Sequence, residues 1–288
     1  MHPYNYYAPE NINDALGLLE KFGSKARCLA GGTDILVQTR GGRFELDAII
    51  DVKNIPELTK VEWTKDHLLV GSAVPCYVLY EDEKVTSQFP GIIDAASLIG
   101  GIQIQSRASL GGNLCNASPS ADGICPLIVH NTICVIAGPK GSREISVDQF
   151  CVSPGKNVLD EGEFLVSLKI PLPNSGFGAA YERFIPRNEM DIAVAAVGSS
   201  VVVDGGKITN SKIALAAVGP TPIYAEKASE FLLGKDVSED NLDQASQIAQ
   251  DSCSPITDMR GDVEFRKHLI GVLTRRTLDL ALERAGGN

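Results

Sequence analysis

The stretch Leu29-Ala30-Gly31-Gly32-Thr33-Asp34-Ile35 is followed, eighty residues later, by the similar stretch Ser109-Leu110-Gly111-Gly112-Asn113. In each, an apolar run leads into two glycines and then into a short polar residue. Glycine permits a positive φ and has no Cβ, so the backbone N–H groups of such a turn can converge on an anion. We therefore predict two Gly-Gly turns that approach a phosphate or a diphosphate.

The kind of ligand follows from what the two stretches lack. Neither carries the lysine that ends an ATP-binding loop, and neither has the G-x-G-x-x-G spacing of the usual nicotinamide site. The hydroxyls of Thr33 and Ser109 either donate to the ligand or cap turns. The pattern favours a permanently held diphosphate. A third pair, in Arg40-Gly41-Gly42-Arg43, lacks a preceding apolar run, and we expect an exposed loop there.

Short elements of mixed type surround the two glycine pairs. A strand over 26–30 and a brief helix over 34–39 place the first pair at an anion-binding corner, where Asp34 either caps the helix or points toward the ligand. Asn13 is expected to cap a helix that ends at Gly23. We expect further strands at 48–52, 68–71, 132–137 and 165–170, and helices at 77–80, 92–99 and 125–131.

A linker divides the chain after the last of these strands, because Pro171-Leu172-Pro173-Asn174-Ser175-Gly176 neither continues a strand nor starts a helix. Three β-type runs follow at 178–184, 192–203 and 207–218, with Asp204-Gly205-Gly206 as a hairpin turn. Helices are expected at 225–233, 241–253 and 263–284. We therefore predict two domains, 1–173 and 177–286, the second a small antiparallel sheet backed by helices.

Composition excludes several classes of protein. The 288 residues carry a formal net charge of −10, which argues against binding nucleic acid or an anionic membrane surface. No apolar run reaches the roughly 20 residues of a membrane span, and the first residues lack a basic region followed by an apolar one. Seven scattered cysteines, an odd number, indicate reduced thiols. We expect a cytoplasmic protein.

Nothing in the spacing of the remaining polar residues indicates a catalytic site. The four histidines are isolated from one another, and each is expected to be a surface or core residue. No Ser/His/Asp set, H-E-x-x-H motif or catalytic carboxylate pair is visible. We therefore predict no catalytic residue and no metal site in this chain.

Three motifs carry a family resemblance: AGGTD at 30–34, SLGGN at 109–113 and SPSAD at 118–122. In this order and spacing they resemble the FAD-binding medium subunit of the molybdenum hydroxylases, the xanthine dehydrogenase and carbon monoxide dehydrogenase flavoprotein family. The resemblance covers essentially the whole chain. It implies an α+β fold: a two-lobed FAD-binding domain of the vanillyl-alcohol oxidase (PCMH) type, then a C-terminal domain of small antiparallel sheet and helices.

The resemblance also implies a set of cofactor-binding residues. Arg183 is one of them, although relatives usually have lysine there. Gln105 stands where relatives usually have arginine, and Arg107 is close enough to replace it. Asp191 matches an acid near the flavin in relatives but is not included in the set. The implied FAD-binding residues are Leu29, Ala30, Gly31, Gly32, Thr33, Asp34, Ile35, Ser109, Leu110, Gly111, Gly112, Asn113, Asp122, Leu165 and Arg183.

The function implied by the resemblance is electron relay in an FAD-dependent oxidoreductase. A large subunit with molybdopterin would act on the substrate, a small subunit with two [2Fe–2S] clusters would pass electrons on, and FAD here would deliver them to an acceptor such as NAD or a quinone. A dimer of heterotrimers is the expected assembly. The large subunit would choose the substrate.

Alternatives remain open at this point. One is a self-sufficient flavin reductase related to the enolpyruvyl-sugar reductases, which would need a general acid and a phosphate site in the C-terminal domain. Another is an assembly module that has lost FAD. Cys115, Cys125 and Cys134 lie in one region, where some relatives that reduce aromatic thioesters carry an extra iron–sulfur cluster, although cluster ligands normally come in closer groups.

Overall fold

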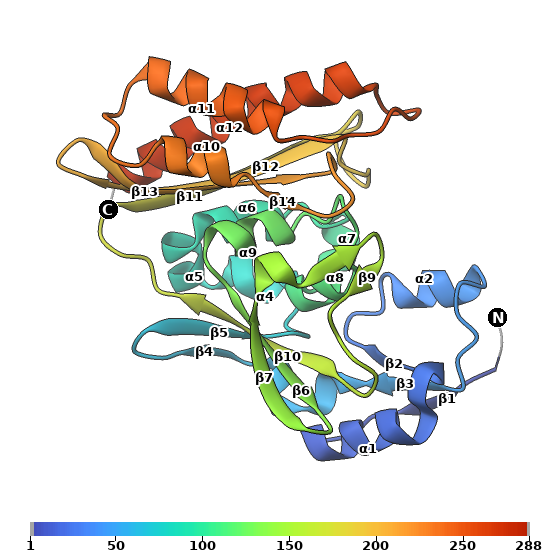
Figure 1. Ribbon diagram of the computed structural model, residues 1–288. Coiled ribbons are helices and arrows are strands. Elements are labelled where there is room, and N and C mark those ends of the chain that lie inside the picture. The colour runs from blue at the N-terminus through green and yellow to red at the C-terminus, as the bar shows by residue number, and fades with distance from the viewer. Residues whose placement is uncertain (1–2, 287–288) are drawn as a thin grey trace.

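The computed structural model describes residues 3–286, in which the strands form sheets of three, five and four strands and a two-stranded ribbon (Figure 1). The three sheets follow one another along the chain. The last strand of the second sheet, β10 (Phe164–Pro171), comes after the two-stranded ribbon in sequence and lies in the middle of the five-stranded sheet. The two larger sheets are antiparallel, and in the C-terminal half the strands precede the helices, which makes the fold α+β. The first two sheets belong to two lobes, and the third belongs to the C-terminal half.

The first lobe is a small parallel sheet with a helix packed on it. All four residues of its central strand β3 are buried, which suits a strand with neighbours on both edges and cover on its faces. Ala15 and Leu19 of α1 join the same apolar cluster. The elements are β1 (Asn5–Tyr7), α1 (Ile12–Phe22), β2 (Ala26–Leu29), α2 (Ile35–Arg40) and β3 (Ala48–Asp51).

The start of α1 differs from the prediction. Asn11, not Asn13, is the N-cap, and its side chain accepts a hydrogen bond of 2.9 Å from the Asp14 amide. The helix begins earlier because Ile12 already packs against the cluster of the first lobe. The predicted end at Gly23 is confirmed, with φ of +52°.

The second lobe is an antiparallel sheet of order β4-β5-β10-β6-β7 covered by short helices. Its core is the largest apolar cluster, with Phe89 and Phe150 fully buried. The other strands are β4 (Val61–Trp63), β5 (His67–Gly71), β6 (Ile133–Gly138), β7 (Gly141–Ser146), and the ribbon β8 (Cys151–Ser153) with β9 (Lys156–Asn157). The helices are α3 (Pro56–Thr59), α4 (Cys76–Glu81), α5 (Glu83–Gln88), α6 (Pro90–Ala96), α7 (Ile102–Gln105), α8 (Leu110–Asn116) and α9 (Ile124–Val129).

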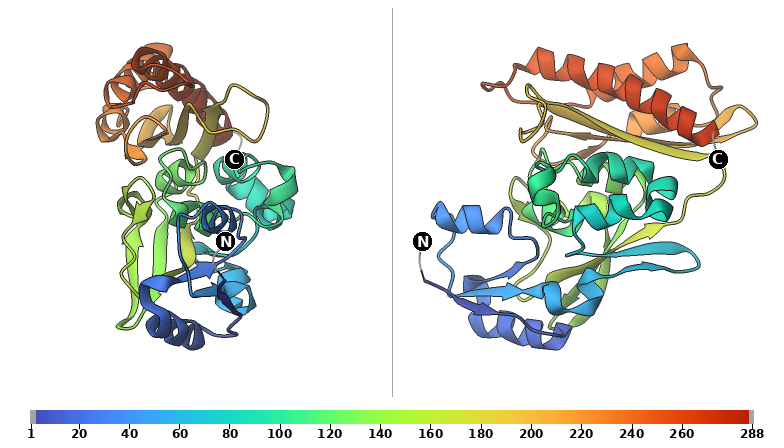
Figure 2. Two further views of the ribbon diagram at one scale, coloured as in Figure 1. Left: turned by 90° about the vertical axis from the view of Figure 1, so that its right-hand side faces the viewer. Right: turned by 180° about the vertical axis from the view of Figure 1, so that it is seen from behind.

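The C-terminal half is a four-stranded antiparallel sheet between two layers of helices. Figures 1 and 2 show α11 and α12 on one face and α6 and α9 of the second lobe on the other. The predicted hairpin is confirmed, since Gly205 and Gly206 both have positive φ. The elements are β11 (Phe177–Phe184), β12 (Ala195–Asp204), β13 (Lys207–Ala216), β14 (Ile223–Tyr224), α10 (Glu226–Phe231), α11 (Glu239–Asp251) and α12 (Val263–Gly286).

Two contacts fix this half against the second lobe. Arg284 of α12 donates to both carboxylate oxygens of Asp94 in α6, at 2.6 and 2.9 Å, and the same carboxylate accepts from the Tyr181 amide of β11. The buried His130 ring lies between Phe89 and Phe177, with centroids 5.8 and 5.3 Å away. The two halves therefore have a fixed relative position. No helix within residues 3–286 combines the length and apolar character needed to cross a membrane.

Candidate functional site

The first Gly-Gly stretch forms a turn between β2 and α2, as predicted. Gly32 has φ of +80°, which favours glycine. Among the described residues, nothing accepts a hydrogen bond from the amides of Gly31, Gly32, Thr33 or Asp34. Unpaired backbone donors in succession form a concave site for an anion. The turn therefore offers N–H groups to a ligand.

The second stretch is not a turn, and here the prediction was wrong. Gly111 and Gly112 lie in the first turn of α8, which Ser109 caps by accepting a hydrogen bond of 3.0 Å from the Gly112 amide. Glycine is needed at 111 for another reason: a Cβ there would lie 2.6 Å from the Ser72 Cα. The helix packs backbone to backbone against the segment after β5.

The two glycine motifs meet in space. A Cβ on Gly31 would lie 1.9 Å from the carbonyl oxygen of Arg107, two residues before Ser109. Only glycine allows the first turn to lie on the backbone that leads into α8. The motifs, eighty residues apart in sequence, form adjoining walls of one site.

A cavity of about 540 Å³ opens between these walls, which is within the range of roughly 300–1,000 Å³ typical of ligand sites. Eleven of the expected residues line it. Leu29 and Leu110 do not, because their side chains point into apolar clusters. The lining residues that were expected are Ala30, Gly31, Gly32, Thr33, Asp34, Ile35, Ser109, Gly111, Gly112, Asn113 and Leu165.

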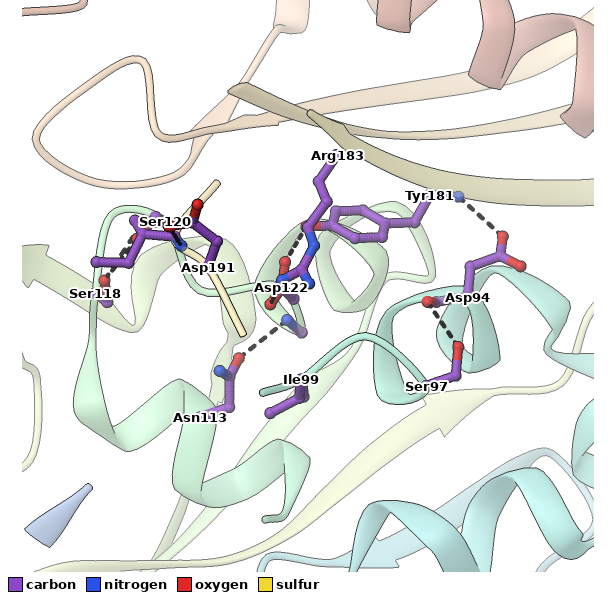
Figure 3. Close-up of polar contacts among 12 residues, drawn as sticks. Asp94, Ser97, Ile99, Asn113, Ser118, Ser120, Asp122, Tyr181, Arg183 and Asp191 are labelled. Carbon is purple, nitrogen blue, oxygen red and sulfur yellow. Dashed lines mark hydrogen bonds and ion pairs between the residues drawn. The ribbon is translucent and has the colours of Figure 1, made fainter. Parts of the chain in front are cut away.

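Asp122 and Arg183 lie outside the cavity lining and form a buried ion pair, with Arg183 Nη1 2.7 Å from Asp122 Oδ2. The Tyr181 hydroxyl donates to the other carboxylate oxygen, also at 2.7 Å. Figure 3 shows Arg183 and Tyr181 reaching from β11 to Asp122, with Asn113 and Ile99 on its opposite side. Since Asn113 and Ile99 line the cavity, the ion pair stands directly behind one end of it.

Removal from solvent dominates the electrostatics of the Asp122–Arg183 pair. Burial raises the pKa of Asp122, and the opposing effect of Arg183 and Tyr181 only partly offsets it. The Arg183 Nε is buried and has no hydrogen-bond partner among the described residues. The Asn113 side chain ties the loop to α8 by accepting from the Gly123 amide at 2.9 Å.

Asp34 occupies the N-cap position of α2 but makes no side-chain capping bond, so the capping alternative was wrong. Asp34 lines the cavity, and burial raises the pKa of its carboxyl group. Gln105 is buried, and its amide donates to the Ser97 carbonyl instead of reaching the cavity. Arg107 is exposed, its side chain lies outside the cavity lining, and its backbone carbonyl packs against Gly31. Asp191 pairs with Arg187 outside the lining.

Sequence reasoning missed several polar residues of the cavity. Lys53 lies outside the cavity lining but anchors the first turn, donating to the Ala30 carbonyl at 2.9 Å and to Asp51 at 2.6 Å. Arg43 lines the cavity although its loop is exposed as predicted. Arg27 lines it too, and the only available signal was a cation inside the short strand before the first turn.

The histidines and cysteines add no second site. His130 is buried with Nδ1 2.8 Å from the Pro126 carbonyl oxygen, but Nε2 has no partner, so only half of this ring is satisfied. His2 lies outside the described residues. Within residues 3–286, no group of three or more His, Cys, Asp or Glu side chains is placed to hold a metal ion.

Comparison with known protein families gives a match for each half of the chain. Residues 2–173 match the FAD binding domain in molybdopterin dehydrogenase, and residues 179–281 match the CO dehydrogenase flavoprotein C-terminal domain.

Three whole-length relatives agree. The xanthine dehydrogenase FAD-binding subunit of Escherichia coli O157:H7 is 31% identical over 98% of this chain and 97% of that protein. The carbon monoxide dehydrogenase medium chain of Afipia carboxidovorans is 29% identical, with 98% of each chain covered. The solved carbon monoxide dehydrogenase of Hydrogenophaga pseudoflava has a chain that superposes with a TM-score of 0.94 at 30% identity, covering 99% of both.

Two adjoining family matches, relatives similar over almost the whole length and a cavity built by the glycine motifs lead to one conclusion: the chain belongs to the FAD-binding medium subunits of the molybdenum hydroxylases, of the xanthine dehydrogenase and carbon monoxide dehydrogenase type.

Proposed function

We propose that this subunit relays electrons from [2Fe–2S] clusters of a partner subunit, through FAD, to an external acceptor such as NAD or a quinone. The observation that carries the proposal is the row of unpaired amides from Gly31 to Asp34, which faces a cavity closed on its other side by α8. FAD, when bound, supplies the redox chemistry, and the protein supplies binding, orientation and electrostatics.

The residues present fit such a cofactor. Gly31 and Gly111 leave no room for a Cβ because each packs against backbone of the second lobe, which holds the two walls of the cavity together. The unpaired amides can donate to its oxygens, and the hydroxyl of Thr33 can add a further donor. The buried Arg183 keeps an unused Nε donor beside one end of the cavity. The amides and the Thr33 hydroxyl can therefore hydrogen-bond to the oxygens of a diphosphate.

The proposal includes all fifteen expected residues as the FAD site. Arg183 and Asp122 would act from behind the cavity end, and Leu29 and Leu110 would act by holding the two motifs in place. It also assigns residues 1–173 to FAD binding and 177–286 to the C-terminal domain. The linker after Pro171 and the ends of β10 and β11 support this division.

The proposed assembly is a dimer of heterotrimers with a large molybdopterin subunit and a small [2Fe–2S] subunit. The relatives support a multi-subunit complex, since two of them are a medium chain and an FAD-binding subunit by name. A cytoplasmic location is part of the proposal, and the seven unpaired cysteines favour a reducing compartment. Their pKa values give no sign of reactive thiolates, because burial raises the pKa of Cys28 and Cys115 to about 12.

The test uses the complex purified with its partner subunits and then stripped of flavin. Chemical reduction of the iron–sulfur clusters should leave the external acceptor unreduced until FAD is added back. Absorption spectra would follow clusters, flavin and acceptor separately. If the stripped complex reduces the acceptor as fast as the reconstituted one, the relay does not pass through this subunit.

A further inference from the structure

Two arginines share one aromatic ring on the cavity wall. The guanidinium carbon of Arg27 lies 5.1 Å from the centroid of Phe44, and that of Arg43 lies 5.4 Å from it. All three residues line the cavity. Contact with an aromatic face holds a guanidinium in a fixed direction and leaves its N–H groups available. We call Arg27, Phe44 and Arg43 the arginine rim.

The arginine rim reaches across from the first lobe to the second. A Cβ on Gly155, in the turn between β8 and β9, would lie 2.5 Å from Arg43 Nη2. Close by, Gln38 of α2 donates to the Asn116 side chain of α8 at 2.8 Å, which also joins the two lobes. The rim thus stands where the two lobes approach one another along the cavity.

The hydrogen bonds of the rim leave donors for a ligand. Arg27 uses Nη1 for the carbonyls of Ser24 and Ala26, at 2.9 and 2.7 Å, and its Nε and Nη2 have no acceptor among the described residues. The Arg43 guanidinium makes no hydrogen bond or ion pair with a described residue, since only its backbone amide donates, to the Gln38 carbonyl at 2.9 Å. Both cations are therefore available to an anionic or aromatic ligand.

Charge in the cavity points to a ligand that needs these cations. Four acids line the same cavity, and of these Glu163 is held by Arg143 at 2.7 Å. The other three leave negative potential that would repel a phosphate. The arginine rim and Lys156 are the cations in the lining that oppose it. The other three acids are Asp34, Asp160 and Glu161.

We infer that the arginine rim binds the adenosine monophosphate half of FAD, so that this chain selects FAD over FMN. A guanidinium can both pair with a phosphate and stack on a purine, which suits the chemistry of that half. FMN keeps the flavin ring and one phosphate but has nothing to place against the rim. The inference rests on the proposed function and adds the source of its cofactor selectivity.

The test compares FAD, FMN and AMP as ligands of the complex after its flavin has been removed. The variant is the double substitution Arg27→Gln with Arg43→Gln. The matched control is Arg40→Gln, an exposed arginine of the same segment that is outside the cavity lining. Flavin fluorescence gives the affinities for FAD and FMN, and AMP is added as a competitor of FAD.

The wild-type complex should bind FAD far more tightly than FMN, and AMP should compete with FAD. The double variant should lose about 10- to 100-fold in FAD affinity, as expected for two charge-assisted contacts, and should keep its FMN affinity. Arg40→Gln should leave both unchanged. Equal losses for FAD and FMN, no loss for FAD, or a similar loss in Arg40→Gln would each overturn the inference. A wild-type complex that binds neither flavin would instead overturn the proposed function.

Discussion

Replacing Gly31 by alanine should separate the two glycine motifs and weaken FAD binding. The backbone of Gly31 has no positive φ, so the effect of an added methyl group is purely steric. Its Cβ would lie 1.9 Å from the Arg107 carbonyl oxygen and 2.4 Å from the carbonyl carbon. Real Cβ atoms essentially never lie within 3.0 Å of a non-bonded heavy atom. The Arg107 backbone and the first turn would therefore have to move apart by about 1.1 Å, the difference between 3.0 and 1.9 Å.

The size of the effect follows from what must move. The obstructing atoms are backbone, so no side chain can rotate away, and the cost lies near the upper end of the roughly 1–3 kcal/mol seen for overpacking. The same shift displaces the walls that hold the diphosphate. If about half or more of that free energy falls on the bound state, FAD affinity drops by about 10- to 100-fold.

The assay is FAD titration of the flavin-stripped complex, with urea unfolding as the stability readout. Gly17→Ala is the matched control: no atom lies within 4 Å of its Cβ, and in helix α1 alanine should stabilise by up to about 1 kcal/mol. If Gly31→Ala keeps FAD affinity within about twofold of the wild type and unfolds at the same urea concentration, the close approach of the two motifs is refuted.

Three further changes test titratable groups that are buried or partly buried. Asp122→Ala leaves Arg183 buried and unpaired, and urea unfolding should show a loss of about 3–5 kcal/mol; an effect below about 1 kcal/mol would contradict the buried pair. Burial lowers the pKa of His130 to about 4, whereas the unfolded chain takes up this proton near pH 6.5, so stability should fall by about 3 kcal/mol as pH drops from 6.5 to 4. His130→Gln should flatten that dependence in urea titrations at several pH values, and an unchanged slope would exclude this histidine as its source. Asp94→Ala should destabilise by about 2 kcal/mol, and a double-mutant cycle with Arg284→Ala should show strong coupling; additive effects would mean that this ion pair does not join the halves.

Much of the fold could be predicted from local pattern, because the signals lie within a few residues of the structure they specify. Gly32 marks a positive φ, Asp204-Gly205-Gly206 marks a hairpin, and the proline-rich segment after β10 marks the passage to a new sheet. The first glycine motif was correctly placed at a strand end for the same reason. The predicted ends of the strand before this motif and of the helix after it agree with the observed ends within one or two residues.

The rest depends on partners distant in sequence, which local pattern cannot show. Gly111 must be glycine because its helix packs closely against the Ser72 backbone. The sequence does not show this distant contact, and we therefore predicted a turn where the structure has the start of a helix. Arg43 lies in an exposed loop, and it lines the cavity because the fold places the turn at Gly155 beside it. Asp94 and Arg284, 190 residues apart, carry no mark that they are a pair.

The cavity lies between the two lobes, which also share an apolar cluster that includes Ala15, Ala73 and Phe164, the contact of Gly31 with Arg107 and the bond from Gln38 to Asn116. A ligand that contacts both lobes stabilises their packing. By mass action, a ligand at a hundred times its dissociation constant adds about 2.7 kcal/mol to the free energy of unfolding. Removal of that ligand would therefore cost the contact between the lobes a similar free energy.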